Sequence, residues 1–346
     1  DPFFMYVAYT APHWPLQALP EDVARYEGRY RKGGWDALRT ARHEEMKGNG
    51  LVSEKWEISP RDEQAPPWQE VDNPDWEDVR MAVYAAQIDR MDQGIGRILD
   101  KLRALDLEDN TLVMFLADNG GCAEFLQEDG WSQRYATQTP DGTPIATGNI
   151  PGVRPGGPDT FMSYDLPWAN ASNAPFRLYK HWVHEGGIAT PLIVYWPQGI
   201  RAKNAWRQRP GHLVDLMTTF VDVAEAEYPT EYAGHQITPM EGESLAPSFK
   251  DADAERQTPI FFEHEGNRAV RVGKWKLVSK AQPRPHTWIK IDELPLEVWE
   301  LYDLEADRSE VNNLADDHPD RVKEMATLWQ DWAERTLVVP KPAETY

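Results

Sequence analysis

The sequence predicts an α/β fold: a largely parallel, doubly wound sheet, followed by a small C-terminal α+β lobe that contains an antiparallel sheet. Apolar runs at 3–9, 111–117 and 191–196 do not alternate with polar residues, which is typical of strands buried on both faces. A long helical pattern separates the first two runs. After about residue 250 the runs become short and β-rich, with tight turns between them. We therefore expect an α/β domain over 1–250 and a small subdomain over 251–346.

Three helices are predicted by apolar residues that recur every three or four positions. The first runs from about Trp76 to Leu105 and would bury Ile88, Met91, Ile95, Ile98 and Leu102. The second runs from about His212 to Glu227, with Leu213, Leu216, Phe220 and Val223 on its inner side. The last runs from about Pro319 to Thr336 and would bury Val322, Met325, Leu328 and Trp332.

The C-terminal lobe should hold four antiparallel strands, near Ile260–Glu263, Arg268–Val272, Trp275–Val278 and Trp299–Leu304. Two earlier stretches lack periodicity. Residues 48–75 are polar and contain proline, so we expect a surface excursion. Residues 138–175 are rich in glycine and proline, and we expect a long loop that forms a rim around the site, because long loops in compact domains are usually functional.

Composition excludes some classes of function. The chain has 346 residues, with 36 basic and 57 acidic side chains, so its net charge is −21. This charge weighs against nucleic acid as a partner, since phosphate binding needs a basic face. An anionic substrate would need a local positive pocket. No apolar run approaches the roughly 18 residues of a membrane span. With one cysteine, no internal disulfide can form.

The chain opens directly on an apolar run, Phe3–Tyr9, with no polar lead-in and no initiator methionine. A domain rarely begins on its own core strand. We therefore expect residue 1 to be an internal position of a longer protein.

A metal site is predicted where the apolar run at 111–117 ends. Asp118 and Asn119 follow it directly and are followed in turn by two glycines, Gly120 and Gly121. In an open α/β sheet, ligands bind at the carboxyl ends of strands. Carboxylate and amide oxygens suit Ca²⁺ or Mg²⁺, but calcium takes about six to eight oxygens, so other ligands must come from elsewhere.

Two further segments could form an anion-binding pocket. His13 follows the first apolar run, between Pro12 and Pro15, where an imidazole can donate to an anion or protonate a leaving group. Lys180 lies beside His181 and His184, an unusual concentration of basic residues in an acidic protein. A turn histidine without function and solvated surface charge are the respective alternatives.

Other candidates have a structural interpretation that we prefer. Asp89 and Asp92 share one helical face, and His212 with Asp215 marks a helix start, where an acid is favoured by the helix dipole. The cluster 263–265 is expected to be structural. Cys122 lies near the predicted metal ligands, but no pattern singles out a base that would make it a nucleophile.

Taken together, these motifs resemble the sulfatase family of the alkaline-phosphatase superfamily, specifically bacterial arylsulfatases. The resemblance is carried, in order over essentially the whole chain, by six segments: Phe3–Ala18, Tyr84–Leu99, Ala117–Glu124, Tyr179–Pro197, Phe262–Leu277 and Trp299–Ala315. Each segment alone is weak evidence, and the set is specific.

The resemblance implies that Asp118 and Asn119 are ligands of an active-site Ca²⁺, with Mg²⁺ less common. It implies that His13 contacts the sulfate ester and helps to protonate the leaving oxygen, and that Lys180 binds the sulfate oxygens. The substrate would be a small-molecule or carbohydrate sulfate ester. A cation, a lysine and a histidine would together stabilise charge on the transferring group.

The chain also departs from the family pattern. Family members use a formylglycine made from the cysteine of a Cys-x-Pro-Ser-Arg motif, together with two adjacent aspartates and a further lysine and histidine, all upstream of the strand that corresponds to 3–9. None of these occurs here, and Cys122 is followed by Ala123 and Glu124. We therefore expect this chain to be the later part of a sulfatase and to be inactive alone. Family habit suggests a periplasmic or secreted enzyme whose signal would lie upstream.

Two alternative functions stay open. One is a phosphoester or phosphonate hydrolase of the same superfamily, which an upstream serine or threonine nucleophile would indicate. The other is a non-catalytic truncated homologue that binds sulfated glycans. Four tryptophans in polar contexts could stack on sugars, although we expect them to pack the excursion onto the domain: Trp35, Trp56, Trp68 and Trp76.

Overall fold

The fold was examined in a computed structural model, which describes residues 2–128, 135–251, 254–280 and 299–339. The chain forms two compact units, each built from interleaved segments. Unit 1 comprises Asp1–Leu105, Ala117–Thr190 and Ser309–Val311, and unit 2 comprises Asp106–Leu116, Pro191–Arg308 and Asn312–Tyr346. The predicted domain boundary between residues 250 and 251 stays a prediction. None of the helices in the described residues is long and apolar enough to cross a membrane.

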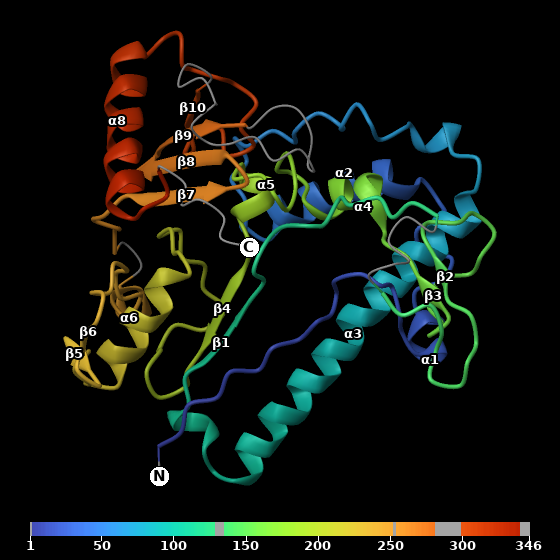
Figure 1. The fold of residues 1–346 in the computed structure, drawn as a ribbon, viewed down its shortest axis with the longest axis horizontal. Helices are drawn as coiled ribbons and strands as arrows, with labels where there is room; N and C mark the ends of the chain where they lie inside the picture. The colour runs from blue at the N-terminus through green and yellow to red at the C-terminus, as the bar shows by residue number, and fades with distance from the viewer. Residues whose placement is uncertain (1, 129–134, 252–253, 281–298, 340–346) are drawn as a thin grey trace. The chain divides into compact units, whose positions relative to one another are not determined.

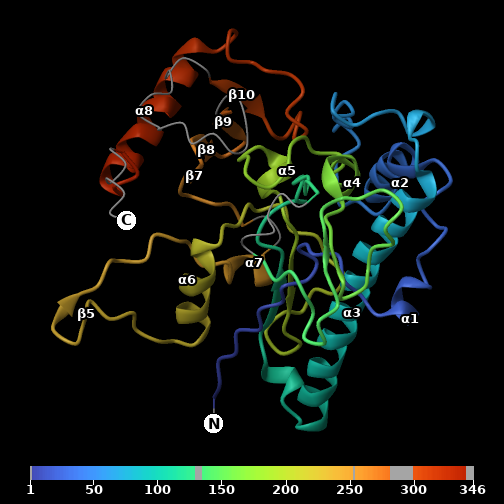
Figure 2. The same ribbon diagram turned by 45° about the vertical axis from the view of Figure 1, so that its right-hand side comes forward.

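Unit 1 is mainly helical. Its elements are α1 (Pro20–Val23), α2 (Gly34–Gly48), η1 (Trp68–Glu70), α3 (Pro74–Ala104), β2 (Ala146–Thr147), β3 (Thr160–Phe161), α4 (Asp165–Ser172) and α5 (Glu185–Ile188). The strands β2 and β3 pair in parallel. In both ribbon views α4 lies beside α2 (Figures 1 and 2).

A tryptophan cluster fills the core of unit 1. The rings of Trp35 and Trp68 lie 4.7 Å apart and those of Trp35 and Trp168 lie 5.2 Å apart, in edge-to-face geometry. All three side chains are buried. Trp56 is also buried, but in a separate and smaller cluster. Trp76 is half-buried and donates to the carbonyl of Val153. These indoles therefore pack the excursion, as expected, and three of the four have no exposed face for stacking on a sugar.

The long helix α3 begins two residues earlier than predicted and buries a different stretch. Its buried apolar residues lie in the first half, where Ala82, Val83 and Ala86 are fully covered. Ile88, on the predicted inner face, is 39% exposed. The loop predicted over 138–175 also differs, because it holds β2, β3 and the eight-residue helix α4.

Unit 2 contains a small antiparallel sheet, as predicted. Its elements are η2 (Glu108–Asn110), β1 (Val113–Leu116), β4 (Leu192–Tyr195), α6 (Val214–Val223), β5 (Glu231–Tyr232), β6 (His235–Gln236), α7 (Pro247–Lys250), β7 (Ile260–His264), β8 (Asn267–Val272), β9 (Trp275–Ser279), β10 (Glu300–Asp303) and α8 (Pro319–Arg335). The sheet order is β10-β9-β8-β7, with every neighbouring pair antiparallel. Helix α8 packs on this sheet (Figure 1), burying Met325, Trp329 and Ala333.

All three of the strands expected in the α/β sheet need correction. β1 and β4 form a pair, but it runs antiparallel, with Val113 opposite Tyr195. In the described residues these two strands form a sheet of their own, so the pairing changes the predicted direction, while helices and strands remain mixed as in an α/β fold. Residues 3–9 are extended but belong to none of the four sheets in the described residues.

The segment 3–9 exposes large apolar side chains, including Tyr6 at 84%. We expect the isolated chain to bind the dye 8-anilinonaphthalene-1-sulfonate strongly and to fold poorly, because exposed apolar edges promote aggregation. Tyr6→Ser should reduce the dye fluorescence, and Tyr232→Ser, at an exposed position of β5 in unit 2, is the matched control. A cooperative melt at high temperature, without dye binding, would contradict this expectation.

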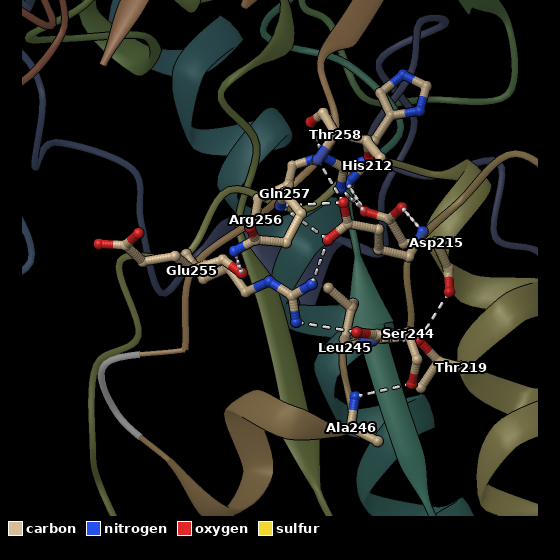
Figure 3. A network of polar contacts seen from close by, with 12 residues as sticks. His212, Asp215, Thr219, Ser244, Leu245, Ala246, Glu255, Arg256, Gln257 and Thr258 are labelled. Carbon is tan, nitrogen blue, oxygen red and sulfur yellow. Dashed lines mark hydrogen bonds and ion pairs between the residues drawn. The ribbon is translucent and has the colours of Figure 1, made fainter. Parts of the chain in front are cut away.

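A buried polar network anchors the start of α6 in unit 2 (Figure 3). The fully buried carboxylate of Asp215 accepts hydrogen bonds from the backbone of His212 and Glu243 and pairs with Arg256. The hydroxyl of Thr219 links the Asp215 carbonyl to the backbone of Leu245. Asp215 is therefore structural, as the sequence suggested.

Glu243 supports the same network and gives it a pH dependence. Burial raises the pKa of its carboxyl, but hydrogen bonds from Thr258, Gln257 and Arg209 outweigh that effect and lower the pKa to about 2. A depressed pKa contributes stability above the ordinary glutamate pKa of about 4.3, and this contribution is lost as the pH falls toward about 2.

We expect Glu243→Gln to lower the free energy of unfolding of unit 2 by roughly 1.5–3 kcal/mol at pH 7, because hydrogen bonds to a charged group are lost. The difference between wild type and variant should shrink as the pH falls from about 4.3 toward 2, because the wild-type carboxylate then gains a proton. Denaturant titrations of both proteins at several pH values measure this difference in the free energy of unfolding. Glu255→Gln is the control, since that side chain is exposed and points away from the network (Figure 3).

Candidate active site

Two loops of unit 1 form the frame of the site. One follows Asp118 and the other runs from Leu178 to Gly187. The backbone amide of Lys180 donates to the carbonyl of Gly121 at 3.0 Å, and that of Gly120 donates to Gly187 at 2.9 Å. A Cβ atom at position 120 would collide with the carbonyl oxygen of Gly186, so the sequence needs glycine there for the loops to meet.

Asn173, at the end of α4, holds both loops. Its Oδ1 accepts from the amide of Gly121 at 2.8 Å. Its Nδ2 donates to the carbonyls of Leu178 and Gly186, each at 2.8 Å. One side chain thus satisfies three backbone groups, which fixes the register between the loops.

The structure brings His13 and Lys180 together from positions 167 residues apart. Lys180 Nζ lies 3.0 Å from His13 Nε2. His13 Nδ1 lies 2.8 Å from the carbonyl oxygen of Trp14, which can only accept, so Nδ1 carries the proton. The lone pair of Nε2 therefore accepts from the Lys180 ammonium. His13 is exposed and Lys180 is 23% exposed, so both side chains are accessible to a ligand.

The backbone next to Lys180 is held in an uncommon conformation. Leu178 and His181 have φ values of 65° and 84°, in the left-handed region that bulky side chains rarely adopt. Such conformations persist only where the surroundings impose them, and they cluster at functional sites. Here they turn Lys180 and His181 toward the same carboxylate.

That carboxylate belongs to Glu124, which the sequence analysis did not single out. Its Oε1 lies 3.0 Å from His181 Nε2, and its Oε2 accepts from Trp14 Nε1 at 2.6 Å and lies 4.0 Å from Lys180 Nζ. The hydrogen bond from His181 is the largest influence on the pKa of Glu124, which is held well below its usual range. Glu124 therefore stays ionised and organises the basic side chains around it.

Cys122 also points at Glu124, with its Sγ 3.1 Å from Oε2. Burial raises the pKa of the thiol to about 12, and the negative charge of Glu124 adds to this effect. Since the thiolate is the nucleophilic form, this cysteine is a poor nucleophile. The expectation that Cys122 is not the catalytic cysteine agrees with its surroundings.

The predicted metal ligands lie at the head of the same loop. Asp118 is exposed, and its Oδ1 accepts from the amide of Asn119 at 3.0 Å. Asn119 donates through Nδ2 to the Gly120 carbonyl at 2.8 Å, which leaves its Oδ1 to act as an acceptor. A carboxylate oxygen and an amide oxygen form a hard donor set, which fits Ca²⁺ or Mg²⁺ in chemistry although not in number.

The four predicted site residues thus lie on segments that the backbone joins directly, with Lys180 bonded to Gly121 and His13 in contact with Lys180. Their roles stay predictions. His181 belongs to the basic segment that the sequence indicated, whereas Glu124 and Trp14 were not predicted as members of the site. The signal available for these two was their proximity in sequence to Cys122 and His13, which does not tell where their side chains point.

The arrangement places a carboxylate and an amide oxygen near a lysine and a histidine, and the roles of these groups remain predictions. Comparison with known protein families identifies the family. The sulfatase family model matches residues 1–226, and the model of the C-terminal region of N-sulphoglucosamine sulphohydrolase matches residues 176–335. The chain belongs to the sulfatase family.

Relatives support this assignment. An uncharacterized sulfatase of Schizosaccharomyces pombe is 32% identical over 98% of the chain and 59% of its own length. An arylsulfatase of Klebsiella aerogenes is 31% identical over 71% of the chain and 51% of its own length. The chain therefore spans about half the length of the curated relatives it matches.

Solved structures confirm the fold class. The crystal structure of Ps i-CgsB matches 96% of this chain and 50% of its own, with a TM-score of 0.56 and 21% identity. At this identity the likeness concerns the fold alone. The fold is thus mixed α/β, like that of Ps i-CgsB, with the small antiparallel sheet β7–β10 near the C-terminus.

Proposed function

We propose that this chain forms the sulfate-binding part of an arylsulfatase-like sulfuric ester hydrolase. One observation carries the proposal: Lys180 and His13 meet at 3.0 Å on a loop frame that also presents Asp118 and Asn119. In a protein of net charge −21, such a local concentration of donors is what an anionic substrate requires. Membership of the sulfatase family supports a sulfate ester as that anion.

In this proposal Lys180 binds the sulfate oxygens through its ammonium group. His13 faces the leaving oxygen and supplies its proton. The lone pair of His13 Nε2 accepts a hydrogen bond from the Lys180 ammonium. A bound sulfate would draw the ammonium toward itself and leave Nε2 free to take up and pass on a proton. Glu124 keeps Lys180 and its neighbour His181 in place.

Asp118 and Asn119 would hold the Ca²⁺, or Mg²⁺, that the family implies. Bound there, the cation would offset negative charge on the transferring group. Two donors fall short of the roughly six to eight that calcium takes. The remaining ligands and the formylglycine nucleophile are expected upstream of residue 1, and with that segment absent this chain alone is expected to be inactive. The substrate is a sulfate ester of a small molecule or a carbohydrate.

The test uses the protein purified from its natural source. Peptide mass spectrometry should find a Cys-x-Pro-Ser-Arg peptide upstream, with its cysteine converted to formylglycine. Release of sulfate from an aryl sulfate should then be compared with release of phosphate from the matching aryl phosphate and phosphonate. A serine or threonine nucleophile with preferred phosphate release would replace this proposal by the phosphoester or phosphonate alternative. A native product that begins at Asp1 and turns over neither ester would end the catalytic proposal.

A further inference from the structure

Three different metal-binding side chains converge beside the lysine–histidine pair. The imidazole of His13, the thiol of Cys122 and the carboxylate of Glu124 each offer one ligand atom, and these atoms lie within 4.8 Å of one another. We propose that these three residues form a site for Zn²⁺ or a similar thiol-binding divalent cation, distinct from the oxygen-donor pair at Asp118 and Asn119.

The orientation of His13 favours this site. Its Nδ1 donates to the Trp14 carbonyl, and a metal-binding histidine characteristically donates its other ring nitrogen in this way. The lone pair that a metal would use therefore lies on Nε2, the atom that faces Lys180. His13 is exposed, so its ring can shift the short distance that closes the cluster, and the ion has a path from solvent.

Cys122 and Glu124 supply the other two ligands. The Cys122 thiol already points at Glu124 Oε2 from 3.1 Å, close to the separation of two ligands on one zinc ion. On binding, the metal displaces the thiol proton to solvent, and the hydrogen bond is replaced by two metal–ligand bonds. One nitrogen, one sulfur and one oxygen leave a fourth tetrahedral position for water. Calcium and magnesium prefer oxygen alone, so this set discriminates against them.

Metal and sulfate would compete at this point. A cation on Nε2 of His13 takes the place of the Lys180 ammonium, which lies 3.0 Å from the same atom. Repulsion between two cations then moves Lys180 away. This consequence rests on the proposed function, whereas binding of the metal does not.

Cobalt is the probe that tests the site, because a Co²⁺–thiolate bond gives a charge-transfer absorption in the near ultraviolet. Cys122 is the single cysteine of residues 1–346, so loss of the band on substitution of this residue assigns it to Cys122. We expect a band that saturates at one Co²⁺ per chain, is abolished by Zn²⁺ and is unchanged by excess Ca²⁺. Cys122→Ser should remove the band.

Variants of the other two ligands distinguish a metal site formed by all three residues from binding to the thiol alone. We expect His13→Ala and Glu124→Gln each to weaken Zn²⁺ binding by at least about tenfold in calorimetry, since even outer-shell partners of a metal are worth that much. His235→Ala, at an exposed strand residue of unit 2, is the control and should change nothing.

The outcomes separate the two proposals. An absent cobalt band, or a band whose affinity is the same in His13→Ala and Glu124→Gln, overturns the zinc site and leaves the sulfatase proposal intact. A band with the expected variant pattern in a protein that hydrolyses no sulfate ester supports the zinc site alone. In an active preparation, Zn²⁺ should inhibit wild type at least about tenfold more strongly than Cys122→Ser, because the serine can still donate to Glu124 but cannot act as a thiolate ligand.

Discussion

Asp118→Ala is expected to abolish detectable Ca²⁺ binding in the natural, metal-binding form of the protein. The carboxylate is the charged member of the pair with Asn119, and calcium affinity depends on the number of charged oxygen ligands. The backbone at this position should not change, because the side chain of Asp118 is exposed and accepts only from the next amide, among the contacts that the described residues make. We expect a loss of at least about 100-fold in affinity, or about 2.7 kcal/mol.

Calorimetric titration of metal-free protein with Ca²⁺ measures this loss. Asp92→Ala is the matched control, since it removes the same charge from an exposed position on α3. Asp118→Asn separates charge from shape by keeping an oxygen donor. It should bind calcium with intermediate affinity. Equal affinities for wild type and Asp118→Ala would remove this residue from the metal site, and equal losses in both alanine variants would point to net charge instead.

The sequence predicted helices well where burial follows the apolar residues. Helix α8 begins at the predicted residue, and of the four residues expected inside, Met325 is buried while Val322, Leu328 and Trp332 are partly buried against the same core. The other buried residues, Trp329 and Ala333, follow Met325 at intervals of four positions. In α6 the same reasoning missed the two fully buried residues and was wrong about Leu213, while Leu216, Phe220 and Val223 are half-buried. Its buried residues are Asp215 and Thr219, while Leu213 is 66% exposed. The apolar periodicity reports only where hydrophobic residues lie. It therefore does not detect a helix face that is anchored by a buried ion pair and hydrogen bonds.

Helix α2 was missed for a related reason. It buries Trp35, Arg39, His43 and Met46, so half of its inner face is polar. The arginine donates to the Ser59 carbonyl, and the histidine ring lies 2.9 Å from the carbonyl of Trp56. Their partners come from the 48–75 excursion, whose own course no local pattern predicts. Long-range hydrogen bonds thus decide which polar residues a helix can bury.

In the candidate site, too, some residues could be predicted from the sequence and others could not. Position at the end of an apolar run identified His13 and Asp118, and charge in an acidic chain identified Lys180. Glu124 carries no such mark, because a single acid in a loop is ordinary. Its importance arises from partners 110 and 57 residues away, Trp14 and His181. The residues proposed to touch a ligand could be recognised from the sequence, and the residue that contacts their neighbours could not.

Lys180→Ala is expected to weaken binding of sulfate and of sulfate esters by roughly ten- to a hundredfold. The variant loses a charge-assisted hydrogen bond, worth about 1.5–3 kcal/mol. The partly buried position makes this contact stronger than one at a fully exposed lysine, because water screens it less. His13 also loses the donor to its Nε2, so its ring gains freedom to turn. We therefore expect a higher KM as well as a lower kcat in an active preparation.

Inhibition by inorganic sulfate separates binding from chemistry, because the inhibitor has no leaving group. Its inhibition constant should rise in Lys180→Ala by the same factor as the loss in substrate binding, while Lys101→Ala, an exposed lysine on α3, should match wild type. Lys180→Arg tests geometry at constant charge. Since a planar guanidinium cannot occupy the place of a compact ammonium 3.0 Å from His13, it should recover sulfate binding more than kcat. Unchanged kinetics in Lys180→Ala would place the sulfate elsewhere and leave Lys180 with a structural role beside His13 and Glu124.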